Sequence, residues 1–390
     1  MILTQTAAIF VDAYRELNAK KLFWITMGLN LLAVILFASL GINDKGFTFW
    51  HWTFDSMFFN TDMVSKELFY KLQFTTWGVP IWLSWVTTIL ALISTAGIIP
   101  DLVSGGTIEP ILSKPISRVR LFLTKYFTGL LFVCLQILVF SVGCFLVLGI
   151  RADSWEFGLF MAIPIVLAFF SYLFSFCVLI GLVTRSTIAA LLLTILFWCV
   201  IFIVNTGDSM MLSQREGAIL RVEDRQTDLE AQERFSATRI EQYREQGKPI
   251  PGEGDEPLPE TATDTLAAVN PTLTLARTRL TDAQDAQRTW TTWAARVYAL
   301  KTILPKTQET IGLLERHLIS NEEIEKLMEQ QGRGEIEAPD EDVSAFADPS
   351  VGPRVVEIVP RRSIWWIHRT SFIFEAVMLG IATRIFARRD

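Results

Sequence analysis

Residues 157–183 read FGLFMAIPIVLAFFSYLFSFCVLIGLV, a run of 27 residues without a charged side chain. A helix needs about 20 mostly apolar residues to cross the hydrocarbon core of a bilayer. This run is therefore long and apolar enough to span a membrane. It predicts an integral membrane protein, and the rest of the chain agrees.

Five other runs share this character, which predicts six membrane-spanning helices in all. The weakest is the last, because it contains Arg369 and Glu375, but Trp365 and Trp366 mark one membrane interface. The fold class we expect is an all-α integral membrane protein with six transmembrane helices, an N-terminal interfacial helix and an extracytoplasmic helical insert. The five other runs are Phe23–Leu40, Trp77–Ile99, Leu121–Leu148, Ile188–Val204 and Trp366–Phe386.

A hydrophilic, acidic segment interrupts the membrane part. Residues 206–363 hold 19 Lys and Arg against 29 Asp and Glu, a local net charge of −10. No basic face stands out anywhere, which argues against a nucleic-acid partner. The cysteines all lie within apolar runs, so the hydrophilic regions offer neither a disulfide framework nor a zinc site.

Short basic segments predict the orientation of the chain, because Lys and Arg are enriched on the cytoplasmic side. With six spans, these segments all fall on one side, and both termini are cytoplasmic. The chain then divides into an amphipathic interfacial helix (1–21), helices one to five (22–205) with a cytoplasmic loop (100–120), an outside domain (206–363), and the sixth helix with its basic tail (364–390). The basic residues are Arg15, Lys20, Lys21, Lys114, Arg118, Arg120, Lys125, Arg185, Arg384, Arg388 and Arg389.

The regions outside the membrane have distinct patterns. Aromatic residues crowd positions 47–59, which suggests a segment on the outer membrane surface or a cap on the bundle. In the insert, apolar residues recur every three or four positions between Ala276 and Leu304, and 211–246 reads as a long solvated helix. The stretch 247–263, with four prolines and three glycines, predicts a loop. Together these patterns predict a helical hairpin, with coiled-coil character possible.

The sequence lacks several catalytic and nucleotide-binding motifs. It contains no phosphate-binding Gly-x-x-x-x-Gly-Lys-Ser/Thr loop, no His-Glu-x-x-His motif and no Gly-x-Ser-x-Gly elbow. We therefore expect no catalytic residue, no metal and no cofactor in the chain itself. Glu375 and Arg369 are the candidates for intramembrane polar chemistry, since ionisable groups are costly there. Glu375 could equally bond a neighbouring helix, and Arg369 could reach the interface.

The loop between the second and third spans carries the most specific pattern. It reads Gly106-Thr107-Ile108-Glu109, then Ile111-Leu112-Ser113 and Pro115-Ile116-Ser117-Arg118, with Lys125-Tyr126 at the start of the next span. This order resembles the ABC transporter permeases of the type-2 exporter family, over residues 1–205 and 364–390. Two features depart from the family pattern. The acidic-Arg-acidic cluster before Gly-Thr is reduced to Asp101, and the insert before the last span is far longer.

The resemblance implies that the loop 101–120 docks on a separate cytoplasmic ATP-binding-cassette ATPase subunit. It also implies a second permease copy, identical or paired, and a multi-pass location in the cell's inner (cytoplasmic) membrane. The chain would then be no enzyme itself but would couple its partner's ATP hydrolysis to export or flipping. The residues that the resemblance places in coupling are Asp101, Gly106, Thr107, Ile108, Glu109, Ile111, Leu112, Pro115 and Arg118.

Two other functions remain open from the sequence. The chain could be a non-transporting membrane scaffold or sensor whose outside helical domain binds a partner. A membrane-embedded enzyme is disfavoured, because paired intramembrane acids and histidine clusters are missing. The few polar side chains within the spans mildly favour a lipidic or amphipathic cargo over a small ion, but they do not identify a substrate.

Overall fold

The computed structural model describes residues 11, 15, 18, 21–55, 61, 64–100, 117–254, 256–260, 262–319 and 363–388. The chain divides into two compact units. The membrane unit comprises Met1–Ile203, Thr302–Ile336 and Ser363–Asp390, and the hairpin unit comprises Val204–Lys301 and Glu337–Arg362. Most of the predicted N-terminal interfacial helix (1–21) and most of the loop 100–120 lie outside the described residues.

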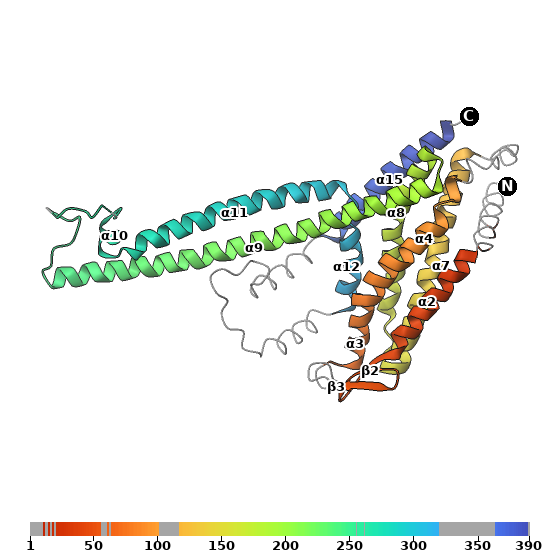
Figure 1. The fold of residues 1–390 in the computed structure, drawn as a ribbon, viewed down its shortest axis with the longest axis horizontal. Coiled ribbons are helices and arrows are strands. Elements are labelled where there is room, and N and C mark those ends of the chain that lie inside the picture. The colour runs from red at the N-terminus through yellow and green to blue at the C-terminus, as the bar shows by residue number, and fades with distance from the viewer. Residues whose placement is uncertain are drawn as a thin grey trace. The chain divides into compact units, whose positions relative to one another are not determined.

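The membrane unit is built almost entirely from helices (Figure 1), which confirms the expected all-α membrane fold. Its helices are α2 (Lys21–Ser39), α3 (Lys66–Gln73), the π-helix η1 (Phe74–Thr87), α4 (Thr88–Thr95), α7 (Arg118–Ala152), the 3-10 helix η2 (Phe157–Met161), α8 (Ala162–Thr184), α12 (Thr307–Leu318), α15 (Ile364–Arg388) and the start of α9 (Thr187–Glu245).

Five described helical stretches are long and apolar enough to cross a membrane: Lys66–Pro100, Arg118–Ala152, Phe157–Thr184, Thr187–Glu245 and Ile364–Arg388. A shorter apolar helix, Phe23–Ser39, covers the first predicted span. The Lys66–Pro100 stretch begins 11 residues before Trp77, the predicted start of the second span, because α3 runs directly into η1. The total of six spans stays a prediction.

Aromatic side chains hold the helices of the membrane unit together. Helix α7 packs against α2 on one flank and α8 on another, and α15 packs against both α8 and α7. Phe74 of η1 stacks on Phe140 of α7, and Tyr126 of α7 stacks on Phe174 of α8. All four rings are at most 1% exposed. Their burial in a continuous core fixes the helices relative to one another.

A three-stranded antiparallel sheet, which the sequence analysis did not anticipate, occupies part of the aromatic-rich segment. Its strands are β1 (Leu40–Asn43), β2 (Gly46–Phe49) and β3 (Trp52–Asp55), in the order β1-β2-β3. The Asn43 side chain accepts hydrogen bonds from the backbone N–H groups of Lys45 and Gly46, which fixes the first turn. The Tyr70 hydroxyl donates to the Leu40 carbonyl at 2.9 Å and ties the sheet to α3.

Helix α12 lies within the region that the sequence analysis assigned to the outside domain. In the structure it packs against α8, η1 and α15 of the membrane unit. Leu313, Leu314 and Leu318 join the core of that unit. The predicted domain boundaries stay a prediction, but the described part of the insert contributes to both units.

The hairpin unit is formed by the rest of α9, the short α10 (Thr265–Val269) and α11 (Thr272–Ile303). Asp208 of α9 pairs with Lys301 at the end of α11 at 2.7 Å, whereas Glu233, further along α9, pairs with Arg277 near the start of α11 at 3.6 Å. The two helices therefore run antiparallel.

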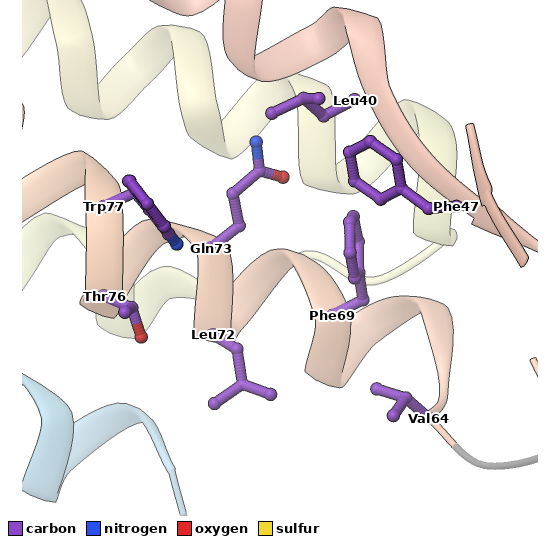
Figure 2. Close-up of a pocket in the computed structure, with 8 residues that line it drawn as sticks. All are labelled: Leu40, Phe47, Val64, Phe69, Leu72, Gln73, Thr76 and Trp77. Carbon is purple, nitrogen blue, oxygen red and sulfur yellow. The ribbon is translucent and has the colours of Figure 1, made fainter. Parts of the chain in front are cut away.

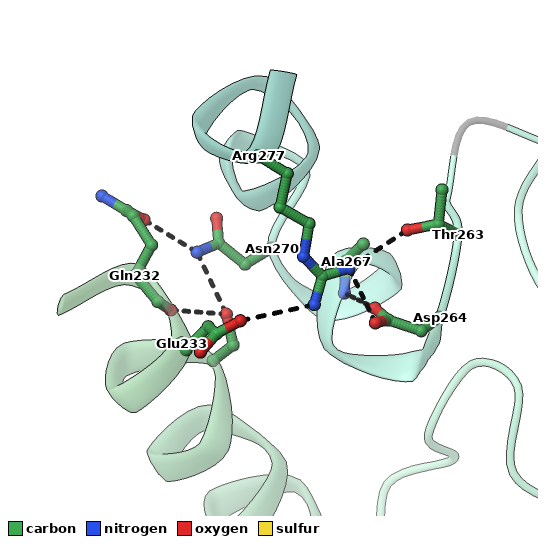
Figure 3. Close-up of polar contacts among 8 residues, drawn as sticks. Gln232, Glu233, Thr263, Asp264, Ala267, Asn270 and Arg277 are labelled. Atoms are coloured by element: carbon green, nitrogen blue, oxygen red, sulfur yellow. Dashed lines mark hydrogen bonds and ion pairs between the residues drawn. The ribbon is translucent and has the colours of Figure 1, made fainter. Parts of the chain in front are cut away.

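Polar contacts connect α9, α10 and α11 at the end of the hairpin where the chain passes from α9 to α11 (Figure 3). Asp264 caps α10 by accepting from the backbone N–H of Ala267 at 2.8 Å, and it accepts from the Arg277 guanidinium at 2.7 Å. The Asn270 amide donates to Gln232 and Ser236 of α9. The backbone bond from Ala267, followed by Arg277, lowers the pKa of Asp264 below its usual value.

Candidate functional site

One end of the membrane unit gathers basic residues. Phe122, in the second turn of α7, contacts Phe386 near the end of α15, with ring centroids 5.5 Å apart. A Cβ atom added at Gly181, near the end of α8, would meet Pro100 at 2.9 Å and Ala190 of α9 at 3.3 Å. The start of α7, the ends of α8 and α15 and the start of α9 therefore lie together.

This end, which we call the basic end, carries Arg118 and Arg120 in the first turn of α7, Arg185 between α8 and α9, and Arg384 and Arg388 in the last turns of α15. In Figure 1 it lies opposite the sheet. Because membrane proteins enrich short cytoplasmic segments in Lys and Arg, the arrangement is typical of a cytoplasmic face.

Of the residues predicted to couple to an ATPase, the structure describes Arg118, the first residue of α7. The helix is preceded by Ser117 in an extended conformation. The other predicted coupling residues lie outside the described residues: Asp101, Gly106, Thr107, Ile108, Glu109, Ile111, Leu112 and Pro115. Their flanking positions, Pro100 and Arg118, both belong to the basic end.

Glu375, the predicted intramembrane candidate, sits at the junction of three helices. From α15 its carboxylate accepts a hydrogen bond from the Tyr126 hydroxyl of α7 at 2.8 Å. Its other oxygen accepts from the Ser171 hydroxyl of α8 at 2.9 Å. We call these three residues the Glu375 cluster. The carboxylate thus joins the three helices in a setting where an unpaired charge would be costly.

Each hydroxyl of the Glu375 cluster has a second acceptor. The Tyr126 hydroxyl also lies 3.2 Å from the Ser171 carbonyl oxygen, and the Ser171 hydroxyl lies 2.8 Å from the Ala168 carbonyl oxygen. With Glu375 ionised, both hydroxyls donate to it. With Glu375 protonated, one hydroxyl oxygen can accept a hydrogen bond from the carboxyl O–H and donate its own hydrogen to a backbone carbonyl oxygen instead. The geometry therefore accommodates either protonation state.

The second predicted intramembrane candidate, Arg369, does not join this cluster. It is six positions before Glu375 on α15, and residues at that spacing do not share a helix face. Its side chain is exposed and makes no hydrogen bond or ion pair with any residue that the structure describes. Exposure on the outside of the bundle fits the reading in which Arg369 reaches the interface.

A second buried polar group links α2 to η1 and α7. The Asn30 side-chain oxygen accepts from the Trp82 indole N–H at 2.8 Å and from the Thr87 hydroxyl at 3.1 Å. One turn away on α2, the Thr26 hydroxyl accepts from the Gln136 amide of α7 at 2.8 Å. Such interhelical hydrogen bonds hold membrane helices in register.

Sequence reasoning missed Tyr126 as a polar partner. Its hydroxyl points into the bundle, and the side chain is 1% exposed. A tyrosine near the start of an apolar run is the only signal that could have indicated it, because the glutamate it binds lies 249 positions away. Tyr126 nevertheless belongs to the quoted Lys125-Tyr126 pair, so the end of the loop motif and a hydrogen-bond partner of Glu375 lie on the same helix, α7.

Comparison with known proteins gives one family. Residues 7–217, more than half of the chain, match the family described as ABC-2 family transporter protein. Neither the search of curated proteins nor the search of solved structures found a match.

Proposed function

Because this chain belongs to the ABC-2 family of transporter proteins and is therefore a membrane subunit of an ABC transporter, we propose that it is the permease of an exporter or flippase. In this proposal a separate ATP-binding-cassette ATPase subunit hydrolyses ATP, and the permease converts the resulting motion into substrate movement. The family match over 7–217 is the observation that carries the proposal.

The basic end supports the position that we propose for the ATPase. Residues 101–120 begin after Pro100 and run into the first turn of α7, and both flanks belong to this end. Its concentration of arginine favours the cytoplasmic side, where ATP is available. We therefore propose that the ATPase docks on 101–120, that both termini are cytoplasmic and that the protein lies in the cytoplasmic membrane.

Helix α7 offers a route from this docking segment into the bundle. Arg118 begins the helix, and Tyr126, about two turns further on, binds both Glu375 of α15 and the backbone of Ser171 in α8. A rigid helix transmits a displacement along its length, so a push at its first turn would reach two other helices through the Glu375 cluster. A second permease, identical or different, would complete the transporter.

Purification from native membranes tests this proposal. An affinity-tagged chain should bring down an ATPase subunit, and the double charge reversal Glu109→Lys with Arg118→Glu should abolish that association. The matched control is Glu241→Lys, on an exposed part of α9 in the hairpin unit, which should retain the ATPase.

Two results would count against the proposal. If no ATPase accompanies the wild-type chain, the scaffold or sensor reading replaces the exporter. If the ATPase accompanies both the double reversal and the control equally, the docking position is wrong.

A further inference from the structure

A cavity of about 520 Å³ opens between the sheet and the start of the Lys66–Pro100 helical stretch. Its volume lies within the range of about 300–1,000 Å³ that ligand sites occupy. Figure 2 shows how its side chains face one another across the space. The cavity is lined by apolar and aromatic side chains, except for the Gln73 amide and the Thr76 hydroxyl. The apolar and aromatic lining residues are Leu40, Phe47, Val64, Phe69, Leu72 and Trp77.

The Gln73 amide is the polar feature of this cavity. The side chain is 8% exposed, and its Oε1 atom is buried without a hydrogen-bond partner among the described residues. In Figure 2 the amide lies among the lining side chains, with Leu40 and Phe47 on one side and Trp77 on the other. A buried carbonyl oxygen left unpaired is costly, so this atom is a ready acceptor for a donor entering the cavity.

The surroundings indicate how a ligand would reach it. Trp77, which lines the cavity, is 64% exposed, and the neighbouring strand β3 exposes Trp52 and Phe54. Tryptophans of this kind favour the level of the lipid headgroups. An amphiphile at that level has its chain next to the apolar walls and its headgroup near the Gln73 amide.

We propose that this cavity binds a single-chain amphiphile whose head carries a hydrogen-bond donor, such as a hydroxyl. The chain packs against Phe69 and Leu72, and the head donates to Gln73 Oε1, which turns toward it about the broad terminal torsion of the side chain. The site lies outside the segments to which transport was assigned above. It requires neither an ATPase nor a second permease.

Photolabelling of the full-length protein, reconstituted in phosphatidylcholine vesicles, tests the proposal. The probes are hexadecanol and hexadecane, each bearing a diazirine in the middle of the chain, and mass spectrometry locates the label. Hexadecanol should label 64–77 saturably, and unlabelled hexadecanol should compete. Gln73→Leu should reduce this labelling about fivefold, toward the level of hexadecane, because one net hydrogen bond is lost.

Two variants on the same helical stretch separate the cavity from the general lipid surface. Leu72→Trp fills the cavity and should abolish the saturable label. Ile93→Trp places the same bulk at an exposed position outside the cavity and should leave the label unchanged. If the labelling is unsaturable and Leu72→Trp does not alter it, the cavity is not the binding site. Equal labelling by both probes at 64–77 would overturn the assigned class of ligand.

Discussion

Glu375 is an ionisable residue inside the helix bundle, and its carboxylate accepts hydrogen bonds from Tyr126 and Ser171. An acid in an otherwise apolar run is conspicuous in the sequence, so Glu375 could be singled out before the structure was known. Tyr126 and Ser171 could not, because they lie 249 and 204 positions away and a periodic pattern shows a buried face without showing what faces it. The structure thus assigns partners to a residue that the sequence could only flag.

Tyr126→Phe should destabilise the membrane unit by about 0.5–2 kcal/mol, because the substitution removes one of the two hydroxyl donors to the Glu375 carboxylate. Thermal unfolding of the purified full-length chain measures the change. Tyr172→Phe is the matched control: Tyr172 is fully buried on α8, and its hydroxyl, which lies near Thr310 and Ser371, makes no hydrogen bond to the Glu375 carboxylate. Equal losses in the two variants would remove the special role of the Tyr126 hydroxyl.

Asp264 should make the end of the hairpin unit sensitive to acid. Its pKa is lowered in the folded protein, so its stabilising effect is fully present above the unfolded-state pKa near 4 and is lost as the pH falls through the folded pKa. Asp264→Ala should therefore cost about 1 kcal/mol of local stability at neutral pH and very little in strong acid.

Hydrogen exchange at the backbone of α10, measured at several pH values, checks this dependence. Asp282→Ala, at an exposed position inside α11, is the control and should leave the exchange of α10 unchanged at every pH. A constant difference between Asp264→Ala and the wild type across the pH range would show that the carboxylate charge does not stabilise the cap.

At the level of elements, apolar length predicted the helices well, because crossing a bilayer requires a long uninterrupted run. Composition was a poorer guide to where a helix ends. The change from apolar to charged residues after Val204 suggests a boundary, yet α9 continues from Thr187 to Glu245. Both kinds of residue support helical backbone, so polarity changes the environment of a helix without ending it.

The strands were missed for a different reason. Each of β1, β2 and β3 has four residues, too few to establish an alternating pattern within a crowd of aromatic side chains. The turn at Asn43 and the hydrogen bond from Tyr70 set the sheet in place, and the second of these joins residues 30 positions apart. The lining of the cavity, which depends on this sheet, was consequently out of reach of sequence reasoning.

Close packing of α2 on α7 depends on Gly143. A Cβ atom added there would lie 2.6 Å from both γ-carbons of Val34, whose branched side chain has little rotameric freedom. Gly143→Ala should therefore destabilise the membrane unit by about 1–3 kcal/mol. Gly28→Ala on α2 adds the same methyl group where no described atom lies within 4 Å and should be tolerated.

Thermal unfolding of both variants, purified in the same detergent, makes the comparison. A Gly143→Ala protein as stable as Gly28→Ala would mean that the two helices are not packed as closely as the structure shows.

For the whole molecule, the central claim is that residues 101–120 face the cytoplasm, where an ATPase subunit can reach them. The family match and the arginines of the basic end support this orientation. The same topology would put the hairpin unit on the outside of the membrane, which stays a prediction. Both assignments depend on which side of the membrane each segment occupies, and one labelling experiment can determine that.

The measurement uses single cysteines at Leu112 and Trp290, introduced separately into a chain whose Cys134, Cys144, Cys177 and Cys199 are replaced by alanine. A membrane-impermeant maleimide is applied to sealed right-side-out vesicles, before and after permeabilisation. The account predicts that Trp290→Cys is labelled in sealed vesicles and Leu112→Cys only after permeabilisation. Labelling of Leu112→Cys in sealed vesicles, or protection of Trp290→Cys until permeabilisation, would contradict it.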